Sequence, residues 1–204
     1  MAGHKLQVTG IDVMDHHLDK ARQNVARSGS LKDYIRVERM DFHHLERLKR
    51  ESFDGVYTME TLAHATDAEQ ALKSFHQILR PGGRIVLHEY EHDHISKTTI
   101  APDVLRAMAQ LTQYAAVPTW GKASRGYFKD SLLRVGFEDV QIKDYSDNVR
   151  PMLRLFWLMA IIPNFFVQLF GLQAHFSNTI AGAYAYKGQK HWRYISISAT
   201  KPEE

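Results

Sequence analysis

Acidic side chains follow two β-branched, apolar segments of the sequence. Asp12 ends the segment 6–13, and Asp41 follows the segment 34–39. A carboxylate at the end of a strand can accept hydrogen bonds from both hydroxyls of a ribose, although it can equally cap the helix that follows. Asp41 stands beside Phe42, and such a pair suits an adenine, whose amine would donate to the acid while the ring packs on the base. Taken alone, this second pair is a weak signal.

A glutamate and a histidine four residues apart follow a third apolar segment, 53–59. Glu60 lies just past the expected end of that strand, where burial is expected, and a buried carboxylate needs a partner or a cation. If the segment is helical, the two side chains share one face. The alternative is a capping glutamate and a histidine on the surface.

Histidines number 12, yet their spacing does not indicate a metal site. A loop-like stretch near the end of the fourth strand groups several ligand-type residues, but without the spacing typical of zinc sites. These residues are His88, Glu89, Glu91, His92, Asp93 and His94. We therefore predict no metal, and we place His88 toward a substrate.

The composition excludes several classes of protein. The 204 residues contain no cysteine, which excludes disulfide scaffolds, cysteine zinc sites and thiol nucleophiles. The 26 basic residues nearly balance the 23 acidic ones, and the net charge of +3 is not that of a nucleic-acid-binding protein. With 44% hydrophobic residues, the chain has the composition of a globular domain.

Alternating strands and helices would position these side chains. In the first half, strands are expected at 6–13, 34–39, 53–59 and 84–90, and helices at 16–27, 43–50 and 68–79. This order predicts an α/β fold with a largely parallel sheet, whose carboxyl edge gathers the acids. In the second half, helices are expected at 103–116, 124–135 and 174–186, and strands at 137–144 and 194–200.

The segment 152–172 is apolar enough to span a bilayer, but polar residues and Pro163 interrupt it. Because proline lacks an amide hydrogen, we expect two short helices that break at Pro163–Asn164. They would fold over the carboxyl edge of the sheet as a lid, with Phe156 and Trp157 in the wall of an apolar pocket. A lid with so many aromatic rings indicates a lipophilic substrate.

Five segments, taken in order, resemble class I S-adenosylmethionine-dependent methyltransferases. They are GIDV (10–13), MDF (40–42), FDGVYTMETLAHA (53–65), LRPGGRIVLHEY (79–90) and LLRVGFEDV (132–140). Within them, ETLAHA (60–65) is similar to the glutamate-to-histidine signature of sterol C-methyltransferases and related small-molecule methyltransferases. The resemblance implies a Rossmann-like methyltransferase sheet, with S-adenosyl-L-methionine as cofactor.

The resemblance also implies roles for particular residues. Glu60 and His64 would be catalytic, the glutamate by stabilising a cation and the histidine by removing a proton. The cofactor would contact Asp12, Val13, Asp41, Phe42, Tyr57 and Met59. The substrate would contact His88, Tyr90, Phe156 and Trp157.

One departure from the family pattern concerns the start of the sheet. The glycine-rich loop and first strand that open such domains have no counterpart before Leu6. We therefore expect residues 1–204 to form a single methyltransferase-like domain, incomplete at its N-terminus, with 145–190 as the lid. Two sheet edges would then face each other. Either they close up, or another chain supplies the strand, or the sequence is a piece of a longer product.

The predicted function is methyl transfer to a lipophilic small molecule, such as a sterol, a terpenoid or another secondary metabolite. The alternatives are a cofactor-free cyclase or isomerase that uses Glu60 or His64 as acid or base, and a non-catalytic pseudo-methyltransferase that binds a partner. No nucleic-acid partner is expected. We expect a cytoplasmic protein. The sequence also permits peripheral membrane contact and the formation of a homo-oligomer.

Overall fold

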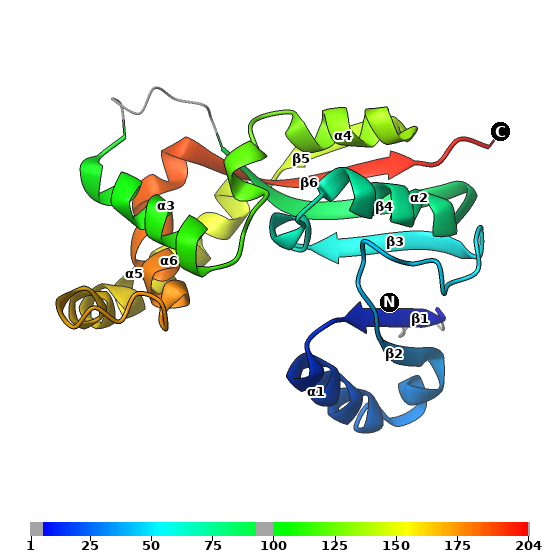
Figure 1. Ribbon diagram of the computed structural model, residues 1–204, viewed down its shortest axis with the longest axis horizontal. Coiled ribbons are helices and arrows are strands. Elements are labelled where there is room, and N and C mark those ends of the chain that lie inside the picture. Colours follow the sequence, from blue (N-terminus) through cyan, green and yellow to red (C-terminus); the bar gives the residue numbers. More distant parts are fainter. Residues whose placement is uncertain (1–5, 93–99, 204) are drawn as a thin grey trace.

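The computed structural model describes residues 6–92 and 100–203, and its strands form two hydrogen-bonded groups (Figure 1). In the first group, β1 (Val8–Asp12) is parallel to β2 (Ile35–Arg39). The second group has the order β3-β4-β6-β5, with bounds Phe53–Met59, Leu79–His92, Trp192–Thr200 and Glu138–Asp144. β3 and β4 are parallel, whereas β6 runs antiparallel to both its neighbours. The predicted α/β fold with mostly parallel strands is confirmed.

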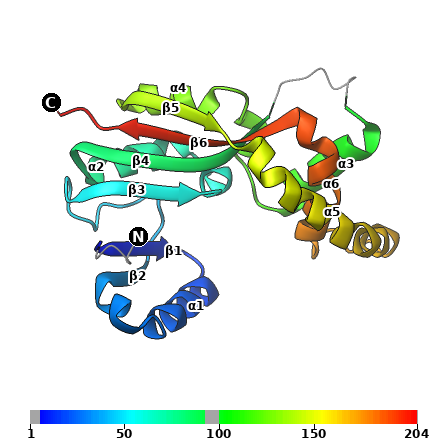
Figure 2. The same cartoon turned by 180° about the vertical axis from the view of Figure 1, so that it is seen from behind.

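β1 is an edge strand of the first group and β3 is an edge strand of the second, and these two edges face each other. Both strands point the same way in Figures 1 and 2, yet no backbone ladder joins them in the described part of the chain. The free edge of β3 carries exposed side chains, since Tyr57 is 44% and Met59 54% exposed. The expected pair of facing sheet edges is therefore present, and the two edges have not closed into one sheet.

The main core lies between the four-stranded sheet and the helices α2 (Ala68–Ile78) and α4 (Tyr127–Val135). The predicted apolar stripe of α2 is buried, with Leu72 fully so, and it packs with Ile85 of β4 and Ile197 of β6. α1 (Asp15–Ala26) packs beside β2 and buries Leu18. These elements hold the strand ends in place.

Three further helices lie beyond the carboxyl ends of β3 and β4 (Figures 1 and 2). They are α3 (Pro102–Tyr114), α5 (Ser146–Leu169) and α6 (Ser177–Gly188). A second, smaller core joins them through Ala107, Val167 and Ile180. α5 and α6 pack along each other, and they correspond to the segment expected to form a lid.

The expected break at Pro163–Asn164 is wrong, because α5 is one helix from Ser146 to Leu169 that contains Pro151 and Pro163. An interior proline costs about 3 kcal/mol. Here Leu153, Asn164 and Val167 are buried on one side of the helix, and this packing outweighs the missing hydrogen bond.

A helix over 43–50 was also expected, but this segment forms turns. The His43 amide donates to Asp41 Oδ1 at 2.8 Å, and the His43 carbonyl accepts from Ser74 Oγ at 2.7 Å. Side chains thus occupy backbone groups that a helix would need. The turn at Pro81–Gly83 is a bulge within β4, where Gly82 adopts a φ of +71° that favours glycine.

Candidate active site

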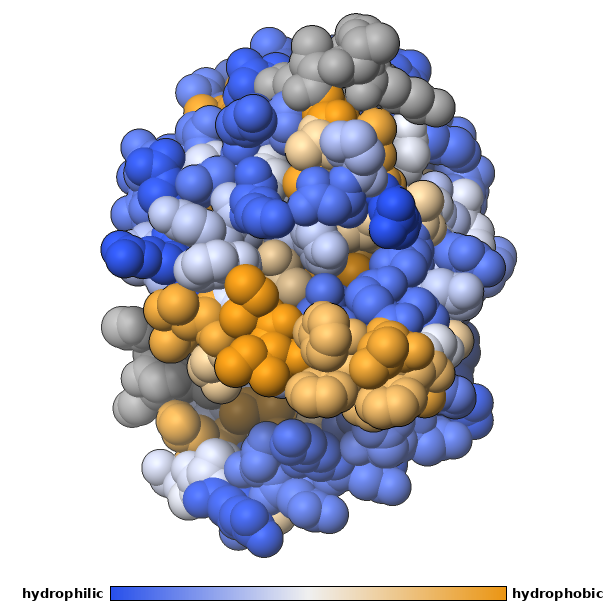
Figure 3. Space-filling model, turned by 90° about the vertical axis from the view of Figure 1, so that its left-hand side faces the viewer, coloured by the Kyte–Doolittle hydropathy of each residue, from blue (hydrophilic) through white to orange (hydrophobic). Residues whose placement is uncertain are grey.

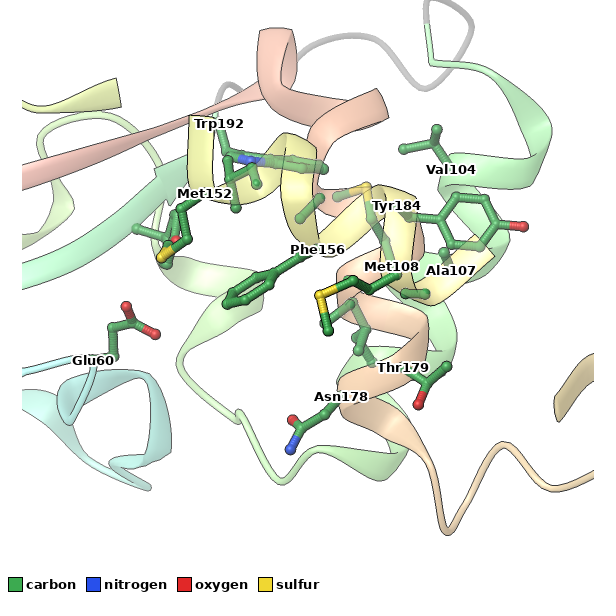
Figure 4. Close-up of a pocket in the computed structure, with 18 of the residues that line it drawn as sticks. Glu60, Val104, Ala107, Met108, Met152, Phe156, Asn178, Thr179, Tyr184 and Trp192 are labelled. Carbon is green, nitrogen blue, oxygen red and sulfur yellow. The ribbon is translucent and has the colours of Figure 1, made fainter. Parts of the chain in front are cut away.

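A cavity of about 680 Å³ opens at the carboxyl end of β3 and β4, between α3, α5 and α6 (Figure 4). Its volume is in the range of small-molecule sites. Apolar side chains dominate its wall, including Met108 of α3, Phe156 of α5 and Trp192 of β6. Of the described residues that line it, Glu60 carries the one carboxylate. The cavity therefore suits a lipophilic ligand, with Glu60 and Tyr90 among the polar side chains that it could contact.

Glu60 occupies a strained turn at the mouth of this cavity. Its amide donates to the His88 carbonyl at 2.7 Å, which continues the β3–β4 ladder by one residue. Its φ is then +52°, a left-handed conformation that is unfavourable for a residue with a Cβ atom. Strain of this kind, held by surrounding structure, is typical of functional positions.

Burial raises the pKa of the Glu60 carboxyl, against the opposing effects of the Tyr194 hydroxyl, which donates a hydrogen bond to it, and of nearby His64. Burial also raises the pKa of Tyr194 to about 12 and that of Tyr90 further, with the charge of Glu60 adding to both. The rings of Tyr90 and Tyr194 lie 4.7 Å apart. Two phenols and a carboxyl thus lie together, and of these three groups Glu60 and Tyr90 line the cavity.

Glu89 supports this turn from behind, and the sequence did not indicate this role. The side chain is 1% exposed, and its Oε1 accepts the amides of Thr61 at 2.9 Å and Leu62 at 2.8 Å. Burial raises the pKa of Glu89 to about 7, although these amide hydrogen bonds oppose the shift. Glu89 therefore fixes the backbone on which Glu60 stands.

His64 ends a 3₁₀ helix, Leu62–His64, and its Nδ1 lies 2.9 Å from the Ala116 carbonyl oxygen. Because a carbonyl only accepts, Nδ1 carries the hydrogen, and Nε2 is left as a base. His64 is exposed and is not among the residues that line the cavity. Its role beside Glu60 stays a prediction.

Asp12 and Asp41 stand at the carboxyl ends of the neighbouring parallel strands β1 and β2. Asp12 Oδ1 accepts the Met14 amide at 2.8 Å, and its Oδ2 lies 3.1 Å from His17 Nδ1. Burial raises the pKa of the Asp12 carboxyl, but these hydrogen bonds outweigh burial, and the pKa lies below its ordinary value. The carboxylate stays ionised and, with about four acceptor sites, keeps capacity for ribose hydroxyls.

Both hydrogen bonds of the Asp41 side chain go to Oδ1, from the His43 amide at 2.8 Å and from His43 Nδ1 at 2.7 Å. Burial raises the pKa of the Asp41 carboxyl, but the hydrogen bonds from His43 outweigh burial, and the pKa lies below its ordinary value. Oδ2 has no partner among the described residues and can accept an amine. Asp12 and Asp41 thus both keep acceptor positions for a ligand, and their contact with the nucleoside part of S-adenosylmethionine stays a prediction.

The remaining predicted site residues divide into two sets. Tyr90 and Phe156 line the cavity, as expected of substrate contacts. Trp157 does not line it; its ring lies 6.1 Å from that of Tyr186. His88 also lies outside it, between aromatic rings on the sheet, 5.6 Å from that of Tyr57.

The expected cofactor contacts Val13, Tyr57 and Met59 are exposed near the facing edges of β1 and β3. Phe42 is half-buried and packs against the main core. Of the ligand-type residues near the end of β4, Asp93 and His94 lie outside the described residues. Among those described, no group of three or more could hold a metal ion.

Comparison with known proteins defines the class. The family model described as "Methyltransferase domain" matches residues 1–87. The S-adenosyl-L-methionine-dependent Diels-Alderase iccD of Talaromyces variabilis is 36% identical over 203 residues, which cover 99% of this chain and 70% of that one. The chain belongs to the family of S-adenosylmethionine-dependent methyltransferases.

Two further comparisons concern one relative in sequence and one solved structure. The O-methyltransferase cnsE of Penicillium expansum is 30% identical over 153 residues, or 74% of this chain and 50% of its own length. The solved structure titled "Crystal Structure of the [4+2]-Cyclase SpnF" superposes with a TM-score of 0.72 at 19% identity, over 98% of this chain and 67% of that one. This likeness supports the fold.

These findings confirm the predicted family, its cofactor class and its enzymatic character. The predicted methyl transfer has a relative named O-methyltransferase, and the alternative of a cyclase has a relative named Diels-Alderase. The alternative expected from the sequence is free of cofactor, whereas the name of that relative includes a dependence on S-adenosyl-L-methionine. Another solved structure with this fold is that of a geranyl diphosphate C-methyltransferase from Streptomyces coelicolor, whose name states a small-molecule substrate. The chain spans 70% of iccD and half of cnsE.

Proposed function

We propose that this protein is an S-adenosylmethionine-dependent enzyme that catalyses a [4+2] cyclisation of a lipophilic, polyunsaturated secondary metabolite. The apolar cavity with a single carboxyl at its mouth carries the proposal. Such a reaction turns three π bonds into two σ bonds and one π bond, and no atom leaves. It therefore needs a shaped, dry cavity that holds diene and alkene together more than it needs a base.

Such a cyclisation is also faster when a hydrogen-bond donor withdraws electrons from the reacting alkene. Both phenols of Tyr90 and Tyr194 are protonated at neutral pH, as tyrosines ordinarily are, and burial moves their pKa values further from it. Tyr90 lines the cavity and can donate to a carbonyl group on the reacting alkene, which withdraws electrons from it. Tyr194 donates to Glu60 and holds that carboxyl in place.

The cofactor supplies a sulfonium cation and a transferable methyl group when it is bound. Asp12 and Asp41 would hold its nucleoside part, as the free acceptor positions on both carboxylates allow. We propose that residues 145–190, which include α5 and α6, act as the lid of a single methyltransferase-like domain. Phe156 of this segment is part of the cavity wall.

Methyl transfer to a lipophilic acceptor is the second candidate, favoured by the family model over 1–87 and by the relative cnsE. The methyl group would pass to the acceptor oxygen or carbon while the acceptor loses a proton. Nε2 of His64 or the Glu60 carboxylate would take that proton. Glu60 could also stabilise cationic character in the transition state.

One experiment separates these reactions. The protein is incubated with methyl-labelled S-adenosylmethionine and a linear polyene that carries a tethered electron-poor alkene, and products are analysed by mass spectrometry. Cyclisation gives a product of unchanged mass and leaves the cofactor intact, whereas methyl transfer adds the label and yields S-adenosylhomocysteine. Cofactor binding in calorimetry without either product would favour a non-catalytic protein instead.

For its location, we propose a cytoplasmic protein with peripheral membrane contact. Within the described residues, α5 is long and apolar enough to cross a membrane by length and composition, and 17% of its most apolar window is buried. A homo-oligomer formed through the same apolar surface is the alternative.

A further inference from the structure

One side of α5 carries a continuous apolar stripe that faces away from the protein. Its residues are 48% to 67% exposed and recur at intervals of three and four, so they fall on one side of the helix. We call them the outer face of α5: Leu155, Leu158, Met159, Ile162, Phe165, Phe166 and Leu169. The stripe is about 21 Å long at 1.5 Å per residue. Figure 3 shows a band of apolar side chains crossing this side of the molecule, with polar surface on either side.

The opposite side of α5 carries the buried residues of the helix. Leu153, Asn164 and Val167 are buried, and Phe156 lines the cavity. Gln168 Nε2 donates to Gln110 Oε1 of α3 at 3.1 Å, which ties α5 to its neighbour. The helix is thus held in place, and its outer face has no covering among the described residues.

The charge distribution indicates what covers this face. From 148 to 202 the sequence contains no aspartate or glutamate. Arg150 and Arg154 stand at the beginning of α5, beside the end of α6, since Arg150 Nε donates to Gln189 Oε1 at 3.1 Å. Arg150 pairs with Asp147, whereas Arg154 and Lys190 form no ion pair with an acid in the described part of the chain.

A second copy of this chain would bring no acid from that segment to Arg154 or Lys190, whereas anionic lipid headgroups would meet both. An apolar stripe beside cationic side chains is typical of helices that lie in a membrane interface. Crossing the bilayer would break the hydrogen bond between Gln168 and Gln110 of α3 and would remove Asn164 and Val167 from their buried positions. The helix can therefore lie on the surface without leaving the protein.

We propose that the outer face of α5 docks on a membrane surface that contains anionic lipid. Met159 belongs both to this face and to the lining of the cavity, so one part of the cavity wall would lie at the docked surface. A lipophilic substrate could then pass from the lipid into the cavity without crossing water. The docking itself does not depend on which reaction the enzyme catalyses.

Vesicle flotation tests the proposal with the purified protein and no substrate. Vesicles of phosphatidylcholine alone are compared with vesicles that also contain phosphatidylserine. The double variant Ile162→Asp, Phe165→Asp places two charges on the outer face, at positions that are 67% and 62% exposed. Leu133→Asp is the matched control, because Leu133 of α4 is 48% exposed on another element.

We expect the wild type and Leu133→Asp to float with the phosphatidylserine vesicles and the double variant to bind at least about tenfold more weakly. Arg154→Glu should weaken binding to the vesicles that contain phosphatidylserine and leave binding to vesicles of phosphatidylcholine alone unchanged. Equal melting temperatures would show that the variants fold. Failure of the wild type to bind, or equal binding by the double variant, would overturn the proposal. So would a wild-type dimer that the double variant abolishes, measured by light scattering without vesicles.

Discussion

The carboxylate of Glu89 accepts the backbone amide of Leu62 at 2.8 Å, across 27 residues of sequence. The bond is buried, and a second one to the Thr61 amide, 2.9 Å long, accompanies it. These contacts join the fourth strand to the turn that carries Glu60, so the position of the cavity carboxyl depends on a side chain outside the cavity.

Removal of this acceptor should destabilise the protein. In Glu89→Ala the amides of Thr61 and Leu62 stay buried without a partner, and the free energy of unfolding should fall by about 1–3 kcal/mol. Urea denaturation measures the change. Glu138→Ala, at an exposed position of β5, is the control and should stay within about 0.5 kcal/mol of the wild type.

The same residue predicts a pH dependence of stability. Because the pKa of Glu89 is about 7 in the folded state and 4.5 as its ordinary value, the folded protein binds this proton more tightly. Stability should therefore fall as pH rises from about 4.5 to 7, by on the order of 3 kcal/mol, and level off above. Glu89→Gln should flatten this slope in denaturation curves. If stability depends on pH as strongly in Glu89→Gln as in the wild type, other titrating groups cause the dependence.

Glu60 and Asp139 permit a test of strain against function, because both adopt a φ near +51° without being glycine. Glu60→Gly and Asp139→Gly should each raise the free energy of unfolding by about 1 kcal/mol, since glycine adopts this conformation readily. Only Glu60→Gly should lose turnover. Comparable turnover in both variants would show that the cavity carboxyl is dispensable.

Asp12→Ala should weaken binding of S-adenosylmethionine by about 1.5–3 kcal/mol, the usual contribution of hydrogen bonds to a charged group. Isothermal titration calorimetry measures the difference. Asp15→Ala is the control, because that side chain is 73% exposed and makes a surface ion pair with Arg39. An affinity that does not change in Asp12→Ala would remove this residue from the cofactor site.

The strand ends were predictable because local patterns determine them. Asp12 and Asp41 follow β-branched segments, and strands do end there. The apolar stripe of α2 likewise appears at helical spacing and is buried. Periodicity reports which side of an element meets the core, and the core lies where it predicts.

Other features depend on contacts between distant segments. Nothing near Glu89 in the sequence indicates that its carboxylate reaches Thr61 and Leu62. Pro163 predicts a break that the packing of Val167 and Asn164 against neighbouring helices overrides. Trp157 and Phe156 are adjacent in sequence, yet only Phe156 lines the cavity, because their positions on the helix face different directions.

The absence of a backbone ladder between β1 and β3 has a dynamic consequence. The unit formed by β1, α1 and β2 is attached to the larger sheet by side chains such as Met40 and Leu45, which reach into the main core. Such a unit can open cooperatively while the rest stays folded. Its amides should exchange with deuterium faster than those of β4 and β6. Since Asp12 and Asp41 belong to it, a bound nucleoside should slow that exchange, coupling cofactor binding to the local folding equilibrium.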